Sequence, residues 1–220
     1  MNEAKEKRPV KLRRRYQSAD GQSVPGVTTV TGLLNKPSLV RWANKLGLEG
    51  VEVSARTEQS ARIGTLVHAM IQAELLGRVF DPVGADPAEL EQAQQALSLF
   101  HAWREQHSLR PIHCETSFVS ERLRFGGTVD CYCILDGRPV LLDFKTGRSI
   151  YDEYFVQLAA YARLLREQGY PVEEVRVLRL GREGGGQAEE RAVSDTEKWF
   201  AVFQALLQVY YLKKDLNWHS

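Results

Sequence analysis

The sequence of 220 residues has no long apolar run, few cysteines and almost no net charge. No stretch approaches the ~18 consecutive apolar residues of a membrane-spanning helix, so we expect no membrane span. The opening segment, MNEAKEKRPVKLRRRY, is charged and lacks the apolar core of a secretory signal, while Glu3 and Glu6 argue against a transit peptide. These absences predict a cytoplasmic protein with no membrane partner.

The cysteine content indicates the cellular compartment, whereas the net charge does not indicate the binding partner. Three cysteines, Cys114, Cys131 and Cys133, suit a reducing compartment. Cys131 and Cys133 alternate with Asp130 along the chain, so we expect them to face away from Asp130 as small buried side chains. The net charge of +1 does not discriminate between partners, because contacts to phosphates can be local. The length suits one domain with a full core.

The stretch FGGTVDCYCILDGRPVLLDFKTGRSIYDEYFVQLAAYA, residues 125–161, organises the rest of the chain. Residues 124–135 and 139–146 read as two strands, and the Asp136-Gly137 pair between them is the usual signal for a short hairpin turn.

Charged residues lie on both strands of this predicted hairpin. Asp130 is on the first strand, while Asp143 and Lys145 are two residues apart on the second and therefore share a face. If the strands pair, Asp130 lies beside Asp143 and Lys145 near one end of the hairpin. Such a group would bind a hard divalent cation, with the lysine beside a water or a phosphate oxygen.

A solvated strand face is the alternative interpretation of these charges. Against it, the apolar run at 140–142 leads directly into Asp143 and Phe144, a pattern typical of a buried strand. Charges are costly there unless they are paired or coordinate a metal. Two glycines shortly before Asp130 also indicate a bulge or a close backbone approach. The flanking sequence therefore favours a site.

These residues resemble the catalytic signature of the PD-(D/E)XK nucleases. Gly127-Thr128-Val129-Asp130 is followed by Asp143-Phe144-Lys145, with Val129 in the place of the proline that names the first motif. The resemblance covers roughly residues 60–180.

Two further motifs resemble those of the RecB-type branch of these nucleases. Gly64 and His68 fit its GxxxH motif, and Gln157 and Tyr161 fit its QxxxY motif. The resemblance implies a restriction-endonuclease-like α/β fold, in which a central mixed sheet is flanked by helices in the order αβββαβ, with an N-terminal helical elaboration.

The resemblance also implies a metal site. Asp130 and Asp143 would be its main carboxylates, the Phe144 carbonyl a further oxygen ligand, and His68 a ligand or a group that supports one. Mg²⁺ fits such a sparse oxygen site, and Mn²⁺ would tolerate His68 better. An iron–sulfur cluster, which some relatives carry, needs four cysteines and is not expected.

The implied activity is hydrolysis of DNA. Lys145 would hold the attacking water, and would act as a base only if its pKa is lowered. Gln157 and Tyr161 would hold the phosphate or sugar, with both side chains turned toward the site and not into the core. The expected enzyme is a single-strand DNA exonuclease in replication, repair or recombination. The alternatives are a structure-specific endonuclease, a nuclease with a helicase partner, and a catalytically silent nucleic-acid-binding module.

The domain organisation is expected to be simple, with a basic tail at residues 1–22 and one nuclease domain at 23–220. The basic run at 11–15 either contacts phosphates or belongs to a solvated tail, which is favoured. Residues 24–49 resemble the opening of small phage and mitochondrial genome maintenance exonucleases, with a helix from about Ser38. Trp42 in that helix can stack on a base, although packing is the favoured role.

Periodicity and capping signals predict the remaining elements. An amphipathic helix is expected at 54–76 with His68 off its apolar stripe, and a second helix, capped by Asp86, to about His107. Glu115, within a strand at 111–120, is a secondary candidate for the site or else a solvent-facing edge residue. There follow a helix at 151–168, strands at 172–181 and 187–193 around a glycine turn at 184–186, and a last helix after a capping box at 194–197.

Overall fold

The computed structural model describes residues 16–181 and 187–218. At its centre lies a five-stranded mixed sheet in the order β3-β4-β5-β6-β7. Strands β5 and β6 are parallel, and the other neighbouring pairs are antiparallel. The strands are Leu109–Ser120 (β3), Phe125–Leu135 (β4), Arg138–Lys145 (β5), Glu174–Arg179 (β6) and Glu189–Val193 (β7).

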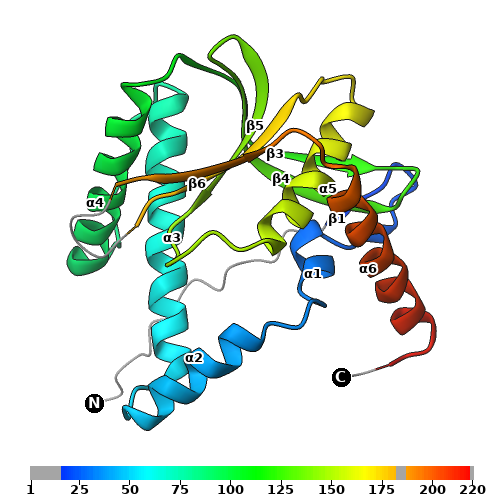
Figure 1. Ribbon diagram of the computed structural model, residues 1–220, viewed down its shortest axis with the longest axis horizontal. Coiled ribbons are helices and arrows are strands. Elements are labelled where there is room, and N and C mark those ends of the chain that lie inside the picture. Colours follow the sequence, from blue (N-terminus) through cyan, green and yellow to red (C-terminus); the bar gives the residue numbers. More distant parts are fainter. Residues whose placement is uncertain (1–15, 182–186, 219–220) are drawn as a thin grey trace, which may run out of the picture.

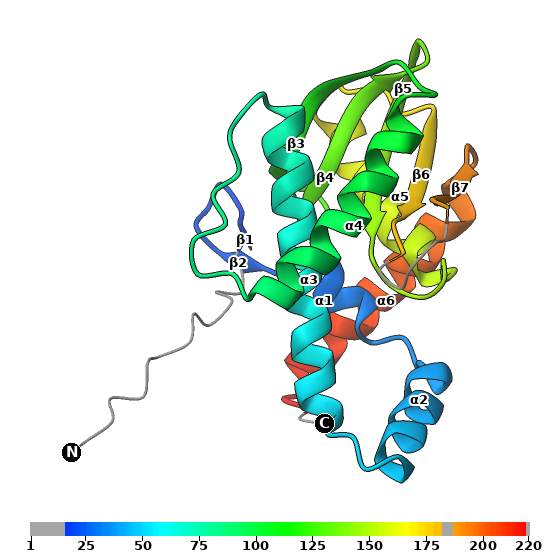
Figure 2. The ribbon, with the colours of Figure 1, turned by 90° about the vertical axis from the view of Figure 1, so that its left-hand side faces the viewer.

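Helices cover both faces of this sheet, as Figure 1 shows. Helices α3 (Val53–Leu75) and α4 (Pro87–Arg104) lie on one face, side by side in the turned view of Figure 2. On the other face, α5 (Glu153–Glu167) connects the parallel strands β5 and β6, and α6 (Glu197–Asp215) packs against α5. The order α4-β3-β4-β5-α5-β6 is the predicted αβββαβ core of the restriction-endonuclease-like fold.

Two hydrophobic clusters hold the layers together, one on each face of the sheet. Cys131, Cys133 and Phe144 lie in the cluster on the α3 and α4 side, whereas Val129 and Tyr132 lie in the cluster on the α5 and α6 side. The central strands are therefore apolar on both faces. The two cysteines are fully buried, as predicted for small core side chains.

The hairpin between β4 and β5 is confirmed. Asp136 and Gly137 have φ values of 51° and 84°, as a two-residue turn with a right-handed strand twist requires. The Asp136 carboxylate accepts hydrogen bonds from the Ser108 amide at 2.8 Å and from His107 Nδ1 at 2.7 Å. These contacts fix the end of the hairpin that lies away from the predicted site.

One helix start agrees with its sequence signal and one does not. The Asp86 carboxylate accepts from the amides two and three residues further on, at 2.9 and 3.2 Å, as an N-cap does. The capping box predicted at 194–197 is wrong, because α6 begins only at Glu197. The N-cap residue is Thr196, and the Glu197 amide donates to Asp195 Oδ1 at 3.0 Å.

The N-terminal part of the described chain adds two short strands and two helices. Strand β1 (Tyr16–Gln17) pairs with β2 (Ser23–Val24), and α1 (Val27–Thr31) and α2 (Pro37–Leu48) follow. Residues 16–22 thus form a hairpin where a tail was predicted. The reason is Tyr16, whose ring packs on Gly126 and whose hydroxyl lies 3.0 Å from Thr128 Oγ1.

Two predicted features lie outside the described residues, namely the basic run at 11–15 and the glycine turn at 184–186. Of the helices that are described, none has both the length and the apolar character needed to cross a bilayer.

Candidate active site

The predicted site lies at a fork between β4 and β5. These strands pair from Leu135 and Arg138 as far as Cys131 and Leu142. Beyond that point β4 stays paired with β3 and β5 with β6, so the two strands separate. Asp130 and Asp143 are the first residues past the fork on β4 and β5. The fork is what gives buried charges room beside each other.

Asp130 bridges the two separating strands. Its Oδ2 accepts a hydrogen bond from the Phe144 amide at 2.9 Å, an amide that β4 no longer satisfies through its own backbone. Phe144 is itself fixed by Phe100 of α4, whose ring meets it edge-on at 5.7 Å between centroids. The expected proximity of Asp130 to the β5 residues is therefore present.

The regular alternation of side chains between the two faces of the sheet is interrupted in β4 at Asp130. Val129 packs in the α5-side cluster, whereas Cys131, two residues later, packs in the α3-side cluster. In a regular strand these residues would share a face. On β3 the pairs Cys114–Cys131 and Thr116–Val129 place Glu115 opposite Asp130, and Glu115 has a φ of 49°. A left-handed conformation costs a residue other than glycine about 1–2 kcal/mol, so the turn at this point is a strained feature of the site.

His68 of α3 completes a group with these two acids. Its Nδ1 lies 3.6 Å from both Glu115 Oε1 and Asp130 Oδ2, and its Nε2 lies 2.9 Å from the Phe144 carbonyl oxygen. One helical turn earlier is Gly64, where an added Cβ would lie 3.3 Å from Thr146 Oγ1. The glycine therefore allows α3 to approach the end of β5 closely enough for His68 to reach the fork.

The donor set of this group fits a divalent cation. The ligand atoms of His68, Glu115 and Asp130 all lie within 4.8 Å of one another. Because Nε2 donates to the Phe144 carbonyl, Nδ1 is the ring nitrogen that faces the two carboxylate oxygens, 3.6 Å from each. Two carboxylates and an imidazole nitrogen grouped in this way can hold a positive charge between them. The Phe144 carbonyl keeps a second lone pair beside the same group.

The electrostatics of His68 reflect these neighbours. Burial lowers its pKa, but Asp130 and Glu115 outweigh burial and raise the pKa of His68 to about 9. In the absence of a metal, a proton on His68 supplies the positive charge that the two carboxylates need.

The other predicted pair, Asp143 and Lys145, lies on the α5 side of the fork. Lys145 Nζ is 2.5 Å from Asp143 Oδ2, and Asp143 is 1% exposed. Burial raises the pKa of Asp143 to about 6, although the neighbouring ammonium works in the opposite direction. Burial lowers the pKa of Lys145, but Asp143 and Asp130 reverse this and leave it raised. Lys145 is therefore a cation at neutral pH.

Gln157 and Tyr161 of α5 lie next to this ion pair. Gln157 Nε2 donates to the Tyr161 hydroxyl at 3.1 Å and approaches Asp143 Oδ1 at 3.4 Å. Tyr161, expected to turn toward the site and not into the core, is 4% exposed and belongs to the α5-side cluster. Its ring fills the space left by Gly127, where a Cβ would lie 2.4 Å from the ring. Burial raises the pKa of Tyr161 well above its usual range.

Tyr154 is a site residue that sequence reasoning missed. Its ring lies under the Lys145 ammonium, with 5.0 Å between Nζ and the ring centroid, a cation–π contact. Tyr154, Gln157 and Tyr161 are spaced at i, i+3 and i+7, so they share one face of α5. Extending the QxxxY motif by one turn toward the N-terminus would have found it.

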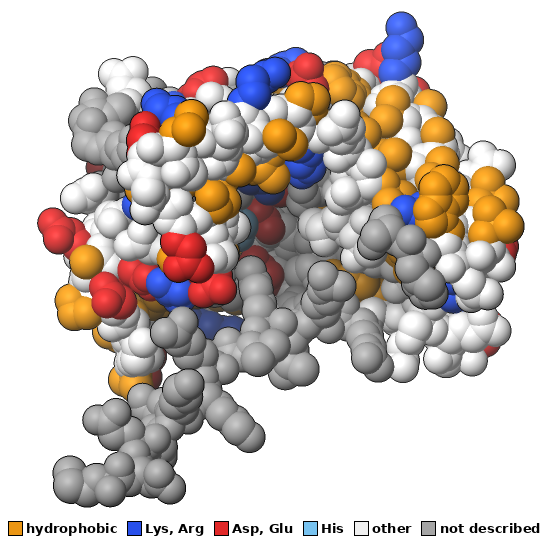
Figure 3. Space-filling model, turned by 90° about the horizontal axis from the view of Figure 1, so that it is seen from below, with side chains coloured by type: hydrophobic (Ala, Val, Ile, Leu, Met, Phe, Trp, Pro, Cys, Tyr) orange, Lys and Arg blue, Asp and Glu red, His pale blue; other side chains and the backbone are white. Residues whose placement is uncertain are grey.

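The two halves of the site meet in a hollow. Figure 3 shows it on the side of the molecule that lies at the bottom of Figure 1, with acidic side chains and a histidine inside it. The imidazole and two carboxylates thus come from α3, β3 and β4, and the ammonium and the buried carboxylate from β5.

The PD-(D/E)XK nuclease superfamily profile matches residues 40–216, which include every residue of this site. The chain belongs to the PD-(D/E)XK nuclease superfamily. The superfamily consists of hydrolytic nucleases that act on DNA and use divalent metals, and the donor group at His68, Glu115 and Asp130 agrees with that chemistry.

Three solved structures that are similar to this chain share little sequence identity with it. A protein from Eubacterium rectale that is assigned as an exonuclease shares 13% identity over 69% of this chain, with a TM-score of 0.46. This chain spans only 65% of the length of that protein. The alkaline exonuclease from Laribacter hongkongensis shares 13% identity over 70% of this chain and 84% of its own, with a TM-score of 0.34. A structure of the same alkaline exonuclease (LHK-Exo) in complex with dAMP shares 11% identity over 72% of this chain and 91% of its own, with a TM-score of 0.39. No curated protein matches the sequence.

Proposed function

We propose that this PD-(D/E)XK nuclease is a Mg²⁺- or Mn²⁺-dependent exonuclease that hydrolyses single-stranded DNA from an end, in replication, repair or recombination. The observation that carries the proposal is the placement of two complementary groups at one fork. Three convergent electron-pair donors lie on one side, and a buried ammonium paired with a carboxylate lies on the other. Together they offer a cation site next to a fixed positive charge.

In this proposal the residues of the site have different roles. His68, Glu115 and Asp130 would hold the metal, with Asp143 and the Phe144 carbonyl beside them, and a bound divalent cation would neutralise phosphate charge and acidify a bound water. Lys145, held by Asp143, would attract a phosphate oxygen and stabilise the charge that develops on it. Gln157 would orient the phosphate or sugar, with Tyr161 fixing its amide from within the core.

The RecB-type branch is part of the same proposal. Of the four residues that carry the motifs of that branch, His68 contacts Phe144 and Gln157 contacts Asp143. Gly64 lies next to Thr146 at the end of β5, and Tyr161 accepts a hydrogen bond from Gln157. A cytoplasmic location is supported by the three cysteines, which are all free thiols.

The distinction between an exonuclease and its alternatives needs a substrate comparison. An exonuclease digests a linear single strand and leaves a closed circular single strand intact, in Mg²⁺ and in Mn²⁺. Cutting of the circle identifies a structure-specific endonuclease, and activity that appears only with an added helicase identifies a partner-dependent nuclease. No cutting of any DNA, with either metal, identifies a silent nucleic-acid-binding module. Strands labelled at the 5′ or the 3′ end then give the polarity.

Two substitutions test the assigned residues. We expect Asp143→Asn and Lys145→Ala each to abolish cleavage of the linear strand, while circular dichroism shows a folded protein. In Lys145→Ala the buried Asp143 loses its cation and is expected to take up a proton. Lys198→Ala is the matched control, because Lys198 is an exposed lysine of α6 outside the fork. Full activity of either site variant refutes the assignment.

A further inference from the structure

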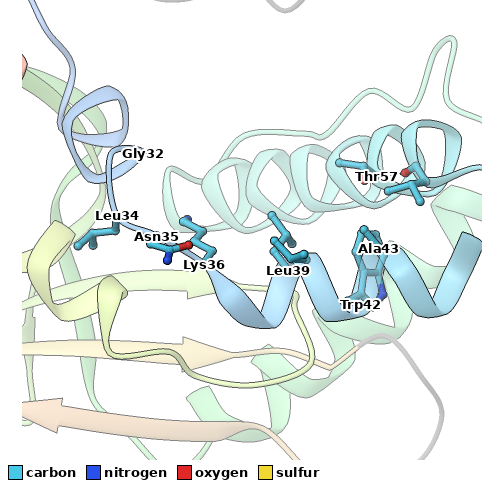
Figure 4. A pocket seen from close by; sticks show the side chains of 10 residues that line it. Gly32, Leu34, Asn35, Lys36, Leu39, Trp42, Ala43 and Thr57 are labelled. Atoms are coloured by element: carbon cyan, nitrogen blue, oxygen red, sulfur yellow. Dashed lines mark hydrogen bonds between the residues drawn. The ribbon is translucent and has the colours of Figure 1, made fainter. Parts of the chain in front are cut away.

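A groove between α2 and α3 is a feature of the molecule that the active site does not use. Its volume is about 480 Å³, and Figure 4 shows Leu39 and Ala43 of α2 directed toward α3, with Thr57 of α3 opposite. The lining is apolar except for Asn35, Lys36 and Thr57, and none of the described residues that line it is acidic.

The α2 wall of this groove is poorly covered by the rest of the chain. Leu39 and Val40 are 55% and 68% exposed, and Trp42 is only half-buried. Figures 1 and 2 show that α2 projects from the body of the molecule on the side where the active-site hollow opens. Apolar surface left in water forfeits roughly 25 cal/mol per Å² that its burial would yield, so a ligand that covers this wall gains binding energy.

The groove is connected to both halves of the active site. Along α3, Val53, Thr57, Ser60, Gly64 and His68 follow one another at spacings of three or four residues and therefore share one side of the helix. From Thr57 to His68 this side runs about 16 Å, at 1.5 Å per residue.

At the end of the groove near α5, Lys36 Nζ lies 2.8 Å from Glu153 Oε1. Glu153 precedes Tyr154, whose ring contacts Lys145. A strand whose phosphate lies at the fork can therefore reach the groove with a neighbouring part of the same chain.

We infer that this groove binds unstacked bases of the DNA strand whose phosphate is cut, with Trp42 as the stacking surface; the inference rests on the proposed function. Bases offer flat apolar faces, which stack on aromatic side chains regardless of sequence. The charge is compatible with a polyanion, because the one charged residue among those that line the groove is a cation, Lys36, which is paired with Glu153. Bases in a duplex are paired and stacked, so the groove admits a single strand and rejects a double strand.

A charge substitution tests the groove without touching the catalytic residues. Val40→Glu introduces a negative charge into the groove at an exposed position. Leu48→Glu introduces the same charge on the same helix, at a position that is 82% exposed and outside the groove. Binding of a labelled single strand is measured by fluorescence anisotropy, with Asp143→Asn added to prevent cleavage. We expect Val40→Glu to weaken binding about tenfold, the size of one lost stacking contact, and Leu48→Glu to have little effect. Equal affinities for the two variants overturn the inference.

Base removal identifies the contact itself. A set of strands is prepared, each lacking the base at one position, and bound to proteins with Trp42, Trp42→Phe and Trp42→Ala. We expect one position at which the missing base weakens binding about tenfold, and at which Trp42→Ala then causes no further loss. Trp42→Phe should keep most of the affinity. If Trp42→Ala binds normally, or loses the same factor on every strand, no base lies on Trp42.

The failure of this inference differs from failure of the proposed function. A protein that digests single strands, but in which Val40→Glu and Leu48→Glu bind alike, retains its function and loses only the groove. A protein that cuts no DNA with Mg²⁺ or Mn²⁺ contradicts the proposed function itself.

Discussion

Replacing Gly127 with alanine should damage both stability and activity, through Tyr161. An added Cβ would lie 2.4 and 2.8 Å from two carbon atoms of the Tyr161 ring and 3.1 Å from Val27 Cγ2. Carbon atoms pack at roughly 3.5–4.0 Å, so the ring must move by about 1 Å. The ring is buried in the α5-side cluster, and its hydroxyl accepts the hydrogen bond from Gln157. The displacement therefore reaches the amide that lies beside Asp143.

The size of the effect follows from two opposing contributions. Overpacking a filled core costs about 1–3 kcal/mol. Alanine also restricts the unfolded chain more than glycine does, which favours folding by about 0.4–1 kcal/mol. The net loss of folding free energy is then about 1–2 kcal/mol. For a chain of this length each kcal/mol lowers Tm by about 2–4 °C, so Gly127→Ala should melt about 2–8 °C below the parent protein.

The assay combines thermal unfolding with single-strand digestion, and Gly47→Ala is the control. Gly47 lies in α2, and no heavy atom is within 4 Å of the position of an added Cβ. Gly47→Ala should melt at or above the parent temperature. In the double variant Gly127→Ala/Tyr161→Ala the clash is absent, so the combined loss should be smaller than the sum of the two single losses. Strictly additive losses, or a parent-like Tm for Gly127→Ala, refute the reasoning.

Three further substitutions probe charge at and away from the site. Glu115→Gln removes one of the three donors and should raise the Mn²⁺ concentration for half-maximal cleavage at least ~10-fold, whereas the exposed Glu91→Gln should leave it unchanged; equal metal titrations exclude Glu115 from the metal site. In metal-free protein, Asp130→Asn should lower the pKa of His68 from about 9, because the Asp130 carboxylate raises this pKa against the effect of burial. An NMR titration measures the pKa of His68, and an unchanged value contradicts the interaction between the two side chains. The Ser18 hydroxyl and the Gln22 amide lower the pKa of Asp20 to about 2, so the stabilisation it provides is complete above the unfolded pKa of about 3.9 and is lost as the pH falls through about 2. The difference in Tm between the parent and Asp20→Asn should therefore shrink as the pH is lowered from 6 toward 2, and a constant difference contradicts it.

Local sequence signals were sufficient for most of the fold. The β4–β5 hairpin was predictable because the turn demands positive φ at two positions and Asp-Gly supplies both. The helix after Asp86 was predictable because a carboxylate there caps free amides. The start of α6 was not, because the sequence signal for a cap stands at Ser194, whereas the helix begins at Glu197 with Thr196 as its N-cap residue and without a cap hydrogen bond from that side chain. The hairpin at 16–24 was missed because its partner, Gly126, is far away in the sequence.

The site was only partly accessible from sequence. Strand periodicity placed Asp143 and Lys145 on one face, and the structure has them in contact. Strand periodicity could not place Glu115. The left-handed conformation of Glu115 and the change of face between Val129 and Cys131 interrupt the alternation of side chains on which a periodicity argument depends. The helical spacing of Gln157 and Tyr161 correctly predicted that the two side chains are neighbours. It did not predict that Tyr161 is buried in the core. This burial depends on the absence of a side chain at Gly127, on another element.

The fork explains why one aspartate connects the two halves of the site. Where β4 and β5 separate, the Phe144 amide loses its backbone partner, and an unsatisfied buried amide costs about 1–3 kcal/mol. Asp130 satisfies that amide with the oxygen that also lies 3.6 Å from His68 Nδ1. The same carboxylate therefore stabilises the separation of the strands and carries the charge that the separation exposes. A neutral asparagine keeps an acceptor for the amide but lacks that charge, so Asp130→Asn is the substitution that separates the role of this residue in the fold from its role in the chemistry.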